Sequence, residues 1–73
     1  MTEQEAFEAL KNGRPVSAKR LISLDWHTFS FRCIQEIQYA KDKQGNIKCY
    51  AQLLDRRANS VTTVPVEDVE YML

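Results

Sequence analysis

The chain has 73 residues, no net charge at neutral pH and 44% hydrophobic residues, and seven of its residues are aromatic. This length provides one small domain with a marginal core, and the hydrophobic content excludes a disordered segment. The first residues are charged and no apolar run reaches the roughly 20 residues of a membrane-spanning helix. We therefore expect a cytoplasmic protein with no secretory leader and no membrane contact.

The charges are unevenly distributed along the chain. Residues 1–10 hold three glutamates and no base, and residues 58–73 hold three acidic residues and no base. Residues 11–57 hold all ten Lys and Arg together with four acidic residues. This basic middle between two acidic ends is the one global feature that indicates a binding partner.

A short amphipathic helix is predicted at the amino end. Thr2 and Glu5 have the spacing of a capping box, and Gly13 supplies a left-handed stop. The apolar stripe consists of Ala6, Phe7, Ala9 and Leu10. Because a helix of about three turns is unstable alone, we expect Phe7 and Leu10 to pack against the rest of the domain.

Period-two patterns predict three strands of a β-meander. The odd-numbered residues of 29–39 and of 47–54 are assigned to the core face, and the turn residues 42–46 join the two strands into a hairpin. Residues 61–64 are β-branched and precede Pro65, which ends a third strand at a sheet edge.

Two further segments complete the fold. Residues 15–24 fit a leading strand, although residues 17–21 would also serve as a short helix; we favour the strand. Residues 65–69, with Pro first and Val66 facing Val69, are typical of a single helical turn. The sequence thus predicts a single α+β domain, residues 1–73, in which a helix precedes a strongly bent antiparallel meander. We expect an SH3-like small barrel with the 47–54 strand at its centre.

The two cysteines are predicted to be free thiols. A turn centred near Gln44 places Cys49 opposite residues 37–39. Cys33 then lies about 13 to 20 Å away along the strand, beyond the roughly 7 Å Cα separation that a disulfide allows. One His and two mismatched Cys also lack the number and spacing of ligands that a metal site needs.

Catalysis is not expected. A Cys33 nucleophile with His27 as base, oriented by Asp25, is conceivable. A chain this short has little room for a substrate cleft, and His27 is better explained as part of a strand-start corner. Gly13 and Gly45 both have turn roles, so no Gly-rich phosphate loop is available. We therefore expect no enzyme activity and no cofactor.

A candidate partner-binding patch lies on the even-numbered face of the central hairpin. If the numbers of facing residues sum to about 86, Tyr50 lies opposite Glu36 and Leu54 opposite Arg32. An apolar cluster with a basic rim results, formed by Arg32, Ile34, Lys48, Tyr50, Leu54, Arg56 and Arg57. The alternative, which we favour, is that the amino-terminal helix covers this cluster and leaves the arginines as solvated surface.

A protein-interaction or adaptor role is the preferred function, because a small barrel-like domain of mixed charge suits it. The alternative is a module that binds single-stranded nucleic acid through the basic hairpin. The glutamates of the helix would repel phosphate, and the two roles differ in salt dependence. A monomer and a weak homodimer formed through an edge strand both fit.

Four stretches carry a family resemblance: "NGRPV", "HTFSFRCIQEIQY", "YAQLLDRRANSV" and "VPVEDVEYM". Together they resemble small uncharacterised accessory proteins encoded on phages and conjugative elements of Gram-positive bacteria. The stretch "SAKRLISLDW" is longer here than in that pattern. The resemblance implies a bacterial, cytoplasmic setting and no known activity, so no functional residue is transferred.

Overall fold

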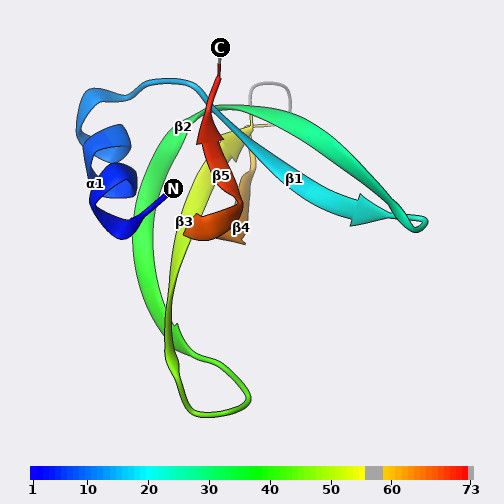
Figure 1. Cartoon of the computed structure of the whole chain (residues 1–73). Coiled ribbons are helices and arrows are strands. Elements are labelled where there is room, and N and C mark those ends of the chain that lie inside the picture. Colours follow the sequence, from blue (N-terminus) through cyan, green and yellow to red (C-terminus); the bar gives the residue numbers. More distant parts are fainter. Residues whose placement is uncertain (56–58, 73) are drawn as a thin grey trace.

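One helix, four strands and a short helical turn follow each other in the predicted order, and a fifth strand that was not predicted comes last (Figure 1). The structure, a computed structural model, describes residues 1–55 and 59–72. Its elements are α1 (Glu3–Asn12), β1 (Val16–Ile22), β2 (Asp25–Lys41), β3 (Ile47–Asp55), β4 (Val61–Pro65), the 3-10 helix η1 (Val66–Asp68) and β5 (Val69–Tyr71). The α+β class is confirmed, and residues 15–24 contain a strand, as favoured from the sequence.

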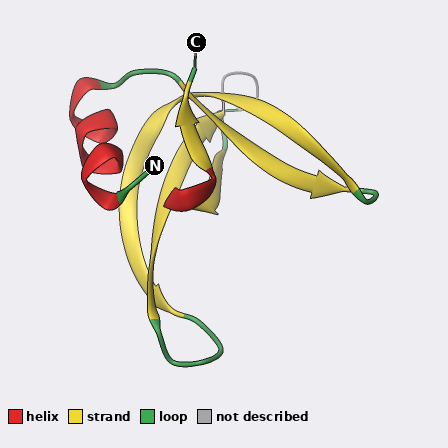
Figure 2. Ribbon diagram, in the orientation of Figure 1, coloured by secondary structure: helices red, strands yellow, loops and turns green. Residues whose placement is uncertain are grey.

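The strands form one antiparallel sheet in the order β4-β3-β2-β1-β5 (Figure 2). The centre is therefore the 17-residue β2, and the expectation that the 47–54 strand is central was wrong. β2 pairs with β1 along its first half and with β3 along its second half, so it is shared by two hairpins. β5 follows β4 in sequence but pairs with β1, which curls the sheet. In the part of the chain that the structure describes, the edges β4 and β5 do not pair, so the sheet is not closed.

Two register shifts in the β2–β3 ladder change the direction of the β2 side chains. Tyr39 lies opposite Cys49, but Ile34 lies opposite Leu53 and Phe31 opposite Asp55. Each shift adds one residue to β2, and one extra residue moves the following side chains to the other face of the sheet. The predicted odd-numbered core face of residues 29–39 is therefore confirmed only in part: Phe31 is buried and Ile37 packs against the core, but between the two shifts the even-numbered Ile34 points inward. Ile34 is only 2% exposed, and Tyr39 is exposed.

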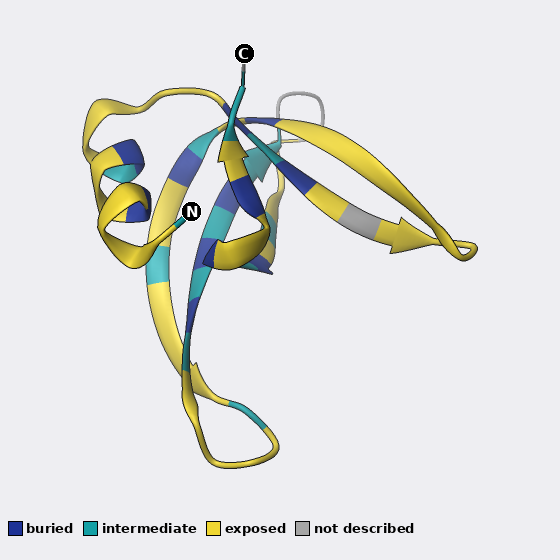
Figure 3. Ribbon diagram, viewed as in Figure 1, coloured by how far each residue is buried: buried dark blue, intermediate teal, exposed yellow. Residues whose placement is uncertain are grey.

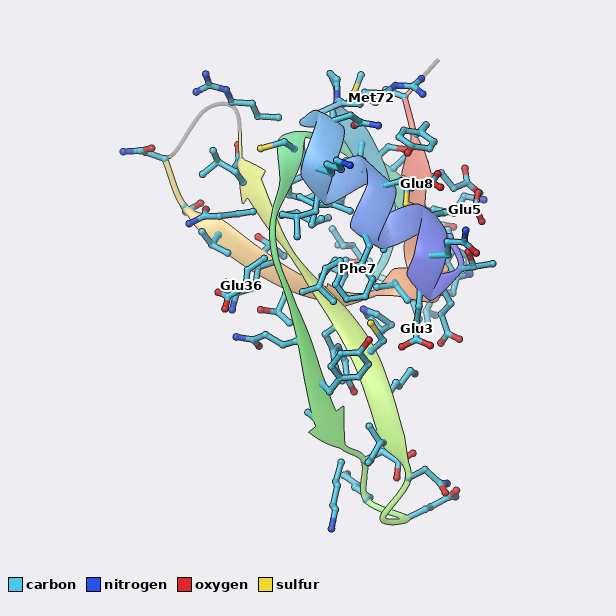
Figure 4. All side chains as sticks on the ribbon, turned by 90° about the vertical axis from the view of Figure 1, so that its left-hand side faces the viewer. Glu3, Glu5, Phe7, Glu8, Glu36 and Met72 are labelled. Carbon is cyan, nitrogen blue, oxygen red and sulfur yellow. The ribbon has the colours of Figure 1, made fainter. Side chains whose placement is uncertain are left out.

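The helix packs through its alanines. Ala6 and Ala9 are fully buried, Leu10 is half-buried, and Phe7 remains 46% exposed (Figures 3 and 4). Small side chains let a helix approach a sheet closely, so the predicted anchoring by Phe7 was wrong. The core that forms comprises Ala6, Ala9, Val16, Ala18, Phe31, Ile34, Cys49, Ala51, Leu53, Val64, Val66 and Val69.

The predicted ends of the helix are confirmed. The Thr2 hydroxyl accepts a hydrogen bond from the Glu5 amide, and the Glu5 carboxylate accepts one from the Thr2 amide, both at 3.1 Å. Gly13 ends the helix in the left-handed conformation, with φ of 68°. The Met1 amino group donates to the carbonyls of Val66 and Val69 at 3.0 and 2.7 Å, which ties the start of α1 to η1 and β5.

Candidate functional site

The β1–β2 hairpin projects from the rest of the sheet, at the right of Figure 1. β5 pairs with β1 at residues 16–18, and in the described part of the chain β1 beyond Ala18 pairs with β2 alone. A two-stranded ribbon that stands alone in water is marginally stable. Contact with a partner would therefore stabilise this segment.

The projecting part of the hairpin is apolar as well as exposed. Every residue from 21 to 30 is exposed (Figure 3). Leu24 is 92% exposed and Trp26 is 67% exposed, and Leu21 lies directly opposite Trp26 across the two strands. The exposed large hydrophobic residues of this hairpin are Leu21, Ile22, Leu24, Trp26 and Phe29. Single exposed hydrophobics are ordinary, but a contiguous group indicates an interaction surface.

Strand alternation divides these side chains between two faces. Val16, Ala18 and Phe31 point to the core, so the face that continues from them carries Ile22 and Phe29. The opposite face, here named the Trp26 face, is formed by Lys19, Leu21, Trp26 and Thr28. Because this face points away from the core, its apolar side chains are open to a partner.

The tip of the hairpin is a two-residue turn with an unusual composition. Ser23 and Leu24 have φ values of 51° and 69°, which glycine and asparagine adopt far more readily than leucine. The left-handed conformation costs a non-glycine residue about 1 to 2 kcal/mol. Leu24 is therefore held at the exposed tip despite a local cost to folding.

Relaxing this turn should stabilise the hairpin locally. We expect Ser23→Asn with Leu24→Gly to slow amide hydrogen exchange in residues 19–28 about fivefold, because the relieved strain of about 2 kcal/mol exceeds the entropy cost of glycine, about 1 kcal/mol. Ser23→Asn alone, which keeps Leu24, is the control. Exchange in the double variant that is unchanged or faster would contradict this account of the turn.

The Trp26 face borders an acidic segment. A depression of about 560 Å³ is lined by Lys19, Trp26, Thr28, Glu67, Asp68 and Glu70. It arises because β5 pairs beside β1, with Glu70 opposite Ser17 on the same face of the sheet, and η1 leads directly into β5. A tryptophan and three acidic residues from distant parts of the sequence thus line one depression.

The sequence pattern by itself does not identify this hairpin as a site. Its strands end in "LI" and "DW" around the turn Ser23-Leu24. A two-residue hairpin turn is normally signalled by Asn-Gly or Asp-Gly, and that signal is absent here. Apolar residues at the ends of both strands would be the only indication.

The patch predicted from the sequence is not formed as one cluster. Ile34 belongs to the core opposite Leu53, so its assignment to the outer face was wrong. Tyr50 and Leu54 are half-buried and alternate with the core residues of β3, so they face away from the core and from α1. The expectation that the helix covers the cluster is therefore wrong for Tyr50 and Leu54, whereas Ile34 is buried in one core with Ala6 and Ala9 of the helix.

Of the four basic residues of that patch, the structure describes Lys48 and Arg32. Lys48 forms an ion pair with Glu67, with Nζ 3.0 Å from Oε1, and this contact raises the pKa of Lys48. Arg32 is exposed on β2. Arg56 and Arg57 lie outside the described residues. The structure thus gives Lys48 an acidic partner within the chain.

The predicted free thiols agree with the strand register. Cys49 lies opposite Tyr39, within the predicted range of residues 37–39, and Cys33 lies opposite Leu54. His27 precedes Cys33 by six residues on the same strand, which separates them by about 20 Å. The conceivable Cys33 and His27 dyad is therefore not assembled. Burial raises the pKa of the Cys49 thiol, which lowers its reactivity.

A second depression, of about 410 Å³, lies where α1 meets the β2–β3 hairpin, and its lining includes Glu3, Tyr39 and Cys49. The Tyr39 hydroxyl donates to the Glu3 carboxylate, and this hydrogen bond raises the pKa of Tyr39 to about 12. The contact joins the first turn of the helix to the far half of β2.

The Tyr39 contact has a pH dependence that can be measured. Folding favours the neutral phenol, so its contribution to stability is present below pH 10 and is lost as the pH rises toward 12. We expect Glu3→Ala to return the pKa of Tyr39 toward 10. The ultraviolet absorbance of tyrosinate measures this, with Tyr39→Phe to assign the signal and Glu8→Ala as the control. An unchanged pKa in Glu3→Ala would contradict the contact.

Among the described residues, no group of three or more His, Cys, Asp and Glu is placed to hold a metal ion. None of the helices in the described chain has the length and apolar character needed to cross a bilayer. Comparisons with protein-family models, with curated proteins and with solved structures return no match to this chain. The candidate site therefore rests on the geometry of the hairpin.

Proposed function

We propose that this chain is a small protein-interaction module that binds its partner through the projecting β1–β2 hairpin. The observation that carries the proposal is the exposure of Leu21 and Trp26 side by side on one face of a two-stranded ribbon, with Leu24 exposed at its tip. Protein interfaces have an apolar, aromatic centre, and tryptophan is among the residues that most often dominate their binding energy. The half of β2 that contains Phe31 and Ile34 packs in the core and holds the hairpin in place. The other half, residues 25–30, forms the exposed strand of the hairpin.

The backbone of the hairpin supports the same proposal. Residues 19–22 of β1 pair with β2 along one edge. Their other edge lies beyond Val69, the residue of β5 at which its pairing with β1 ends. A strand edge of this kind can pair with an extended segment of another chain, whose side chains then contact alternate positions. A partner bound in this way would contact both the edge of β1 and the Trp26 face.

We further propose that the fold has an SH3-like outline. The support is a curled five-stranded antiparallel sheet in which a 3-10 helix separates the last two strands and the last strand returns to the first. The resemblance to accessory proteins of phages and conjugative elements makes the bacterial cytoplasm the proposed setting.

Selection of peptides from a random display library on the immobilised protein tests the function. We expect the selected peptides to lose about tenfold or more in affinity for the variant Leu21→Ser with Leu24→Ser, because truncating central apolar contacts has effects of this size. The matched control is Ile47→Ser with Val61→Ser, which removes two exposed aliphatic side chains elsewhere. Equal binding to both variants, or no selected peptide, would refute the proposal.

The nucleic-acid alternative is tested with the same variants. A phosphate-binding surface would hold a single-stranded oligonucleotide and lose orders of magnitude in affinity between about 50 and 200 mM salt. We expect no such binding, because the ion pair with Glu67 partly neutralises Lys48. Tight, salt-sensitive oligonucleotide binding that the serine variants leave intact would favour the alternative.

A further inference from the structure

We propose that the depression between the Trp26 face and η1–β5 binds a cationic side chain, an arginine or lysine within an extended apolar segment of the partner. This inference rests on the proposed function and names the chemistry of the partner. It combines two independent features of the site: an exposed indole ring from β2 and carboxylates from a segment more than 40 residues later in the chain.

The charges around the depression favour a cation. Glu67 already pairs with Lys48 at 3.0 Å. Asp68 and Glu70 are exposed, and within the described part of the chain neither has an ion-pair partner. Among the described residues of the lining, Lys19 is the one basic residue, and it stands against Asp68 and Glu70 because Glu67 is already paired. The described lining therefore has an excess of negative charge, which favours a cation over a phosphate.

The indole adds selectivity for a cation that can also make apolar contacts. Tryptophan has the strongest attraction for cations among the aromatic side chains, and a guanidinium group can stack on the ring while it donates to carboxylates. The same type of contact occurs elsewhere in this chain, where the Arg14 guanidinium lies 4.1 Å from the centre of the Tyr71 ring. Leu21, which faces Trp26 across the hairpin, provides an apolar neighbour for the residues that flank the cation.

Three synthetic peptides of one design test the inference: acetyl-SLRLRLS-amide, acetyl-SLQLQLS-amide and acetyl-SLELELS-amide. Trp26 is the only tryptophan in the chain, so its fluorescence reports binding at this site directly. We expect the arginine peptide to bind about five- to tenfold more tightly than the glutamine peptide. The glutamate peptide is expected to bind more weakly than the glutamine peptide.

Charge-neutral variants separate the local contact from the net charge of the protein. Asp68→Asn with Glu70→Gln should remove most of the preference for the arginine peptide. The control Glu8→Gln with Glu36→Gln changes the net charge equally, on α1 and on β2 outside the lining of the depression (Figure 4), and should preserve the preference. All four residues are exposed, and circular dichroism verifies that both variants are folded.

The outcomes distinguish this inference from the proposed function. Equal affinity of the wild-type protein for the arginine and glutamine peptides, or an equal loss of preference in the two double variants, would overturn the cationic site. If the affinity of display-selected peptides nevertheless depends on Leu21 and Leu24, the proposed function as an interaction module stands and only the cationic site is refuted. Absence of binding by the arginine peptide, when selected peptides do bind, also refutes the cationic site.

Discussion

Ile34→Ala is expected to lower the free energy of unfolding by about 2 to 5 kcal/mol, as for other large aliphatic residues that are truncated in a core. Ile34 is 2% exposed and lies opposite Leu53, which is fully buried. A domain of this size has a total stability of only about 5 kcal/mol. The variant should therefore be largely unfolded at low urea concentrations, as followed by far-ultraviolet circular dichroism.

Leu54→Ala is the comparison for this prediction. Leu54 is half-buried and lies on the face of β3 away from the core, so its truncation should cost less than about 1.5 kcal/mol. In a β2 strand without register shifts, Ile34 would share the outer face with Leu54 and the two variants would be similar. A cost for Ile34→Ala no larger than that for Leu54→Ala would therefore refute the bulge between Ile34 and Glu36.

Ala9→Leu is expected to destabilise the domain by about 1 to 3 kcal/mol, because extra methylene groups do not fit into a packed interface without strain. Ala9 is fully buried where α1 meets the sheet. Urea denaturation measures the effect. Glu8→Leu is the matched control, since it introduces the same side chain at the preceding, exposed position of the helix (Figure 4).

Phe7→Ala completes the comparison on the helix. Because Phe7 is 46% exposed, its truncation should cost less than truncation of a core phenylalanine, which is about 3 to 5 kcal/mol. If Ala9→Leu were as stable as Glu8→Leu, or if Phe7→Ala were the more damaging change, the helix would pack through the Phe7 stripe that the sequence predicts.

The two halves of β2 serve different purposes in this arrangement. Phe31 and Ile34 pack in the core, while residues 25–30 form the exposed strand of the hairpin. The base of the hairpin is held by the buried residues Val16 and Ala18 of β1. A rigid base with an exposed apolar end holds Trp26 beside the acidic segment and lowers the entropy cost of binding.

Features that depend on neighbouring residues can be predicted from the sequence. The capping box of Thr2 and Glu5, the Gly13 stop and the places of the first four strands along the chain follow from hydrogen bonds, turn preferences and side-chain alternation within a few residues. The length of the 42–46 turn limits the partner of Cys49 to residues 37–39, and Tyr39 is that partner. The pairings of Tyr50 with Glu36 and of Leu54 with Arg32 were wrong, because Tyr50 lies opposite Gln38 and Leu54 opposite Cys33. The sequence thus predicts a helix end or a turn when the residues that form it are neighbours along the chain.

Long-range packing sets which side chains are buried and which meet at the candidate site. The bulge that turns Ile34 inward and the burial of Ala9 instead of Phe7 depend on the close packing of helix and sheet, which neighbouring residues do not encode. Trp26 and Glu70 come together because β5 returns to β1. A site formed by strands from opposite ends of a chain is defined only when the sheet is complete.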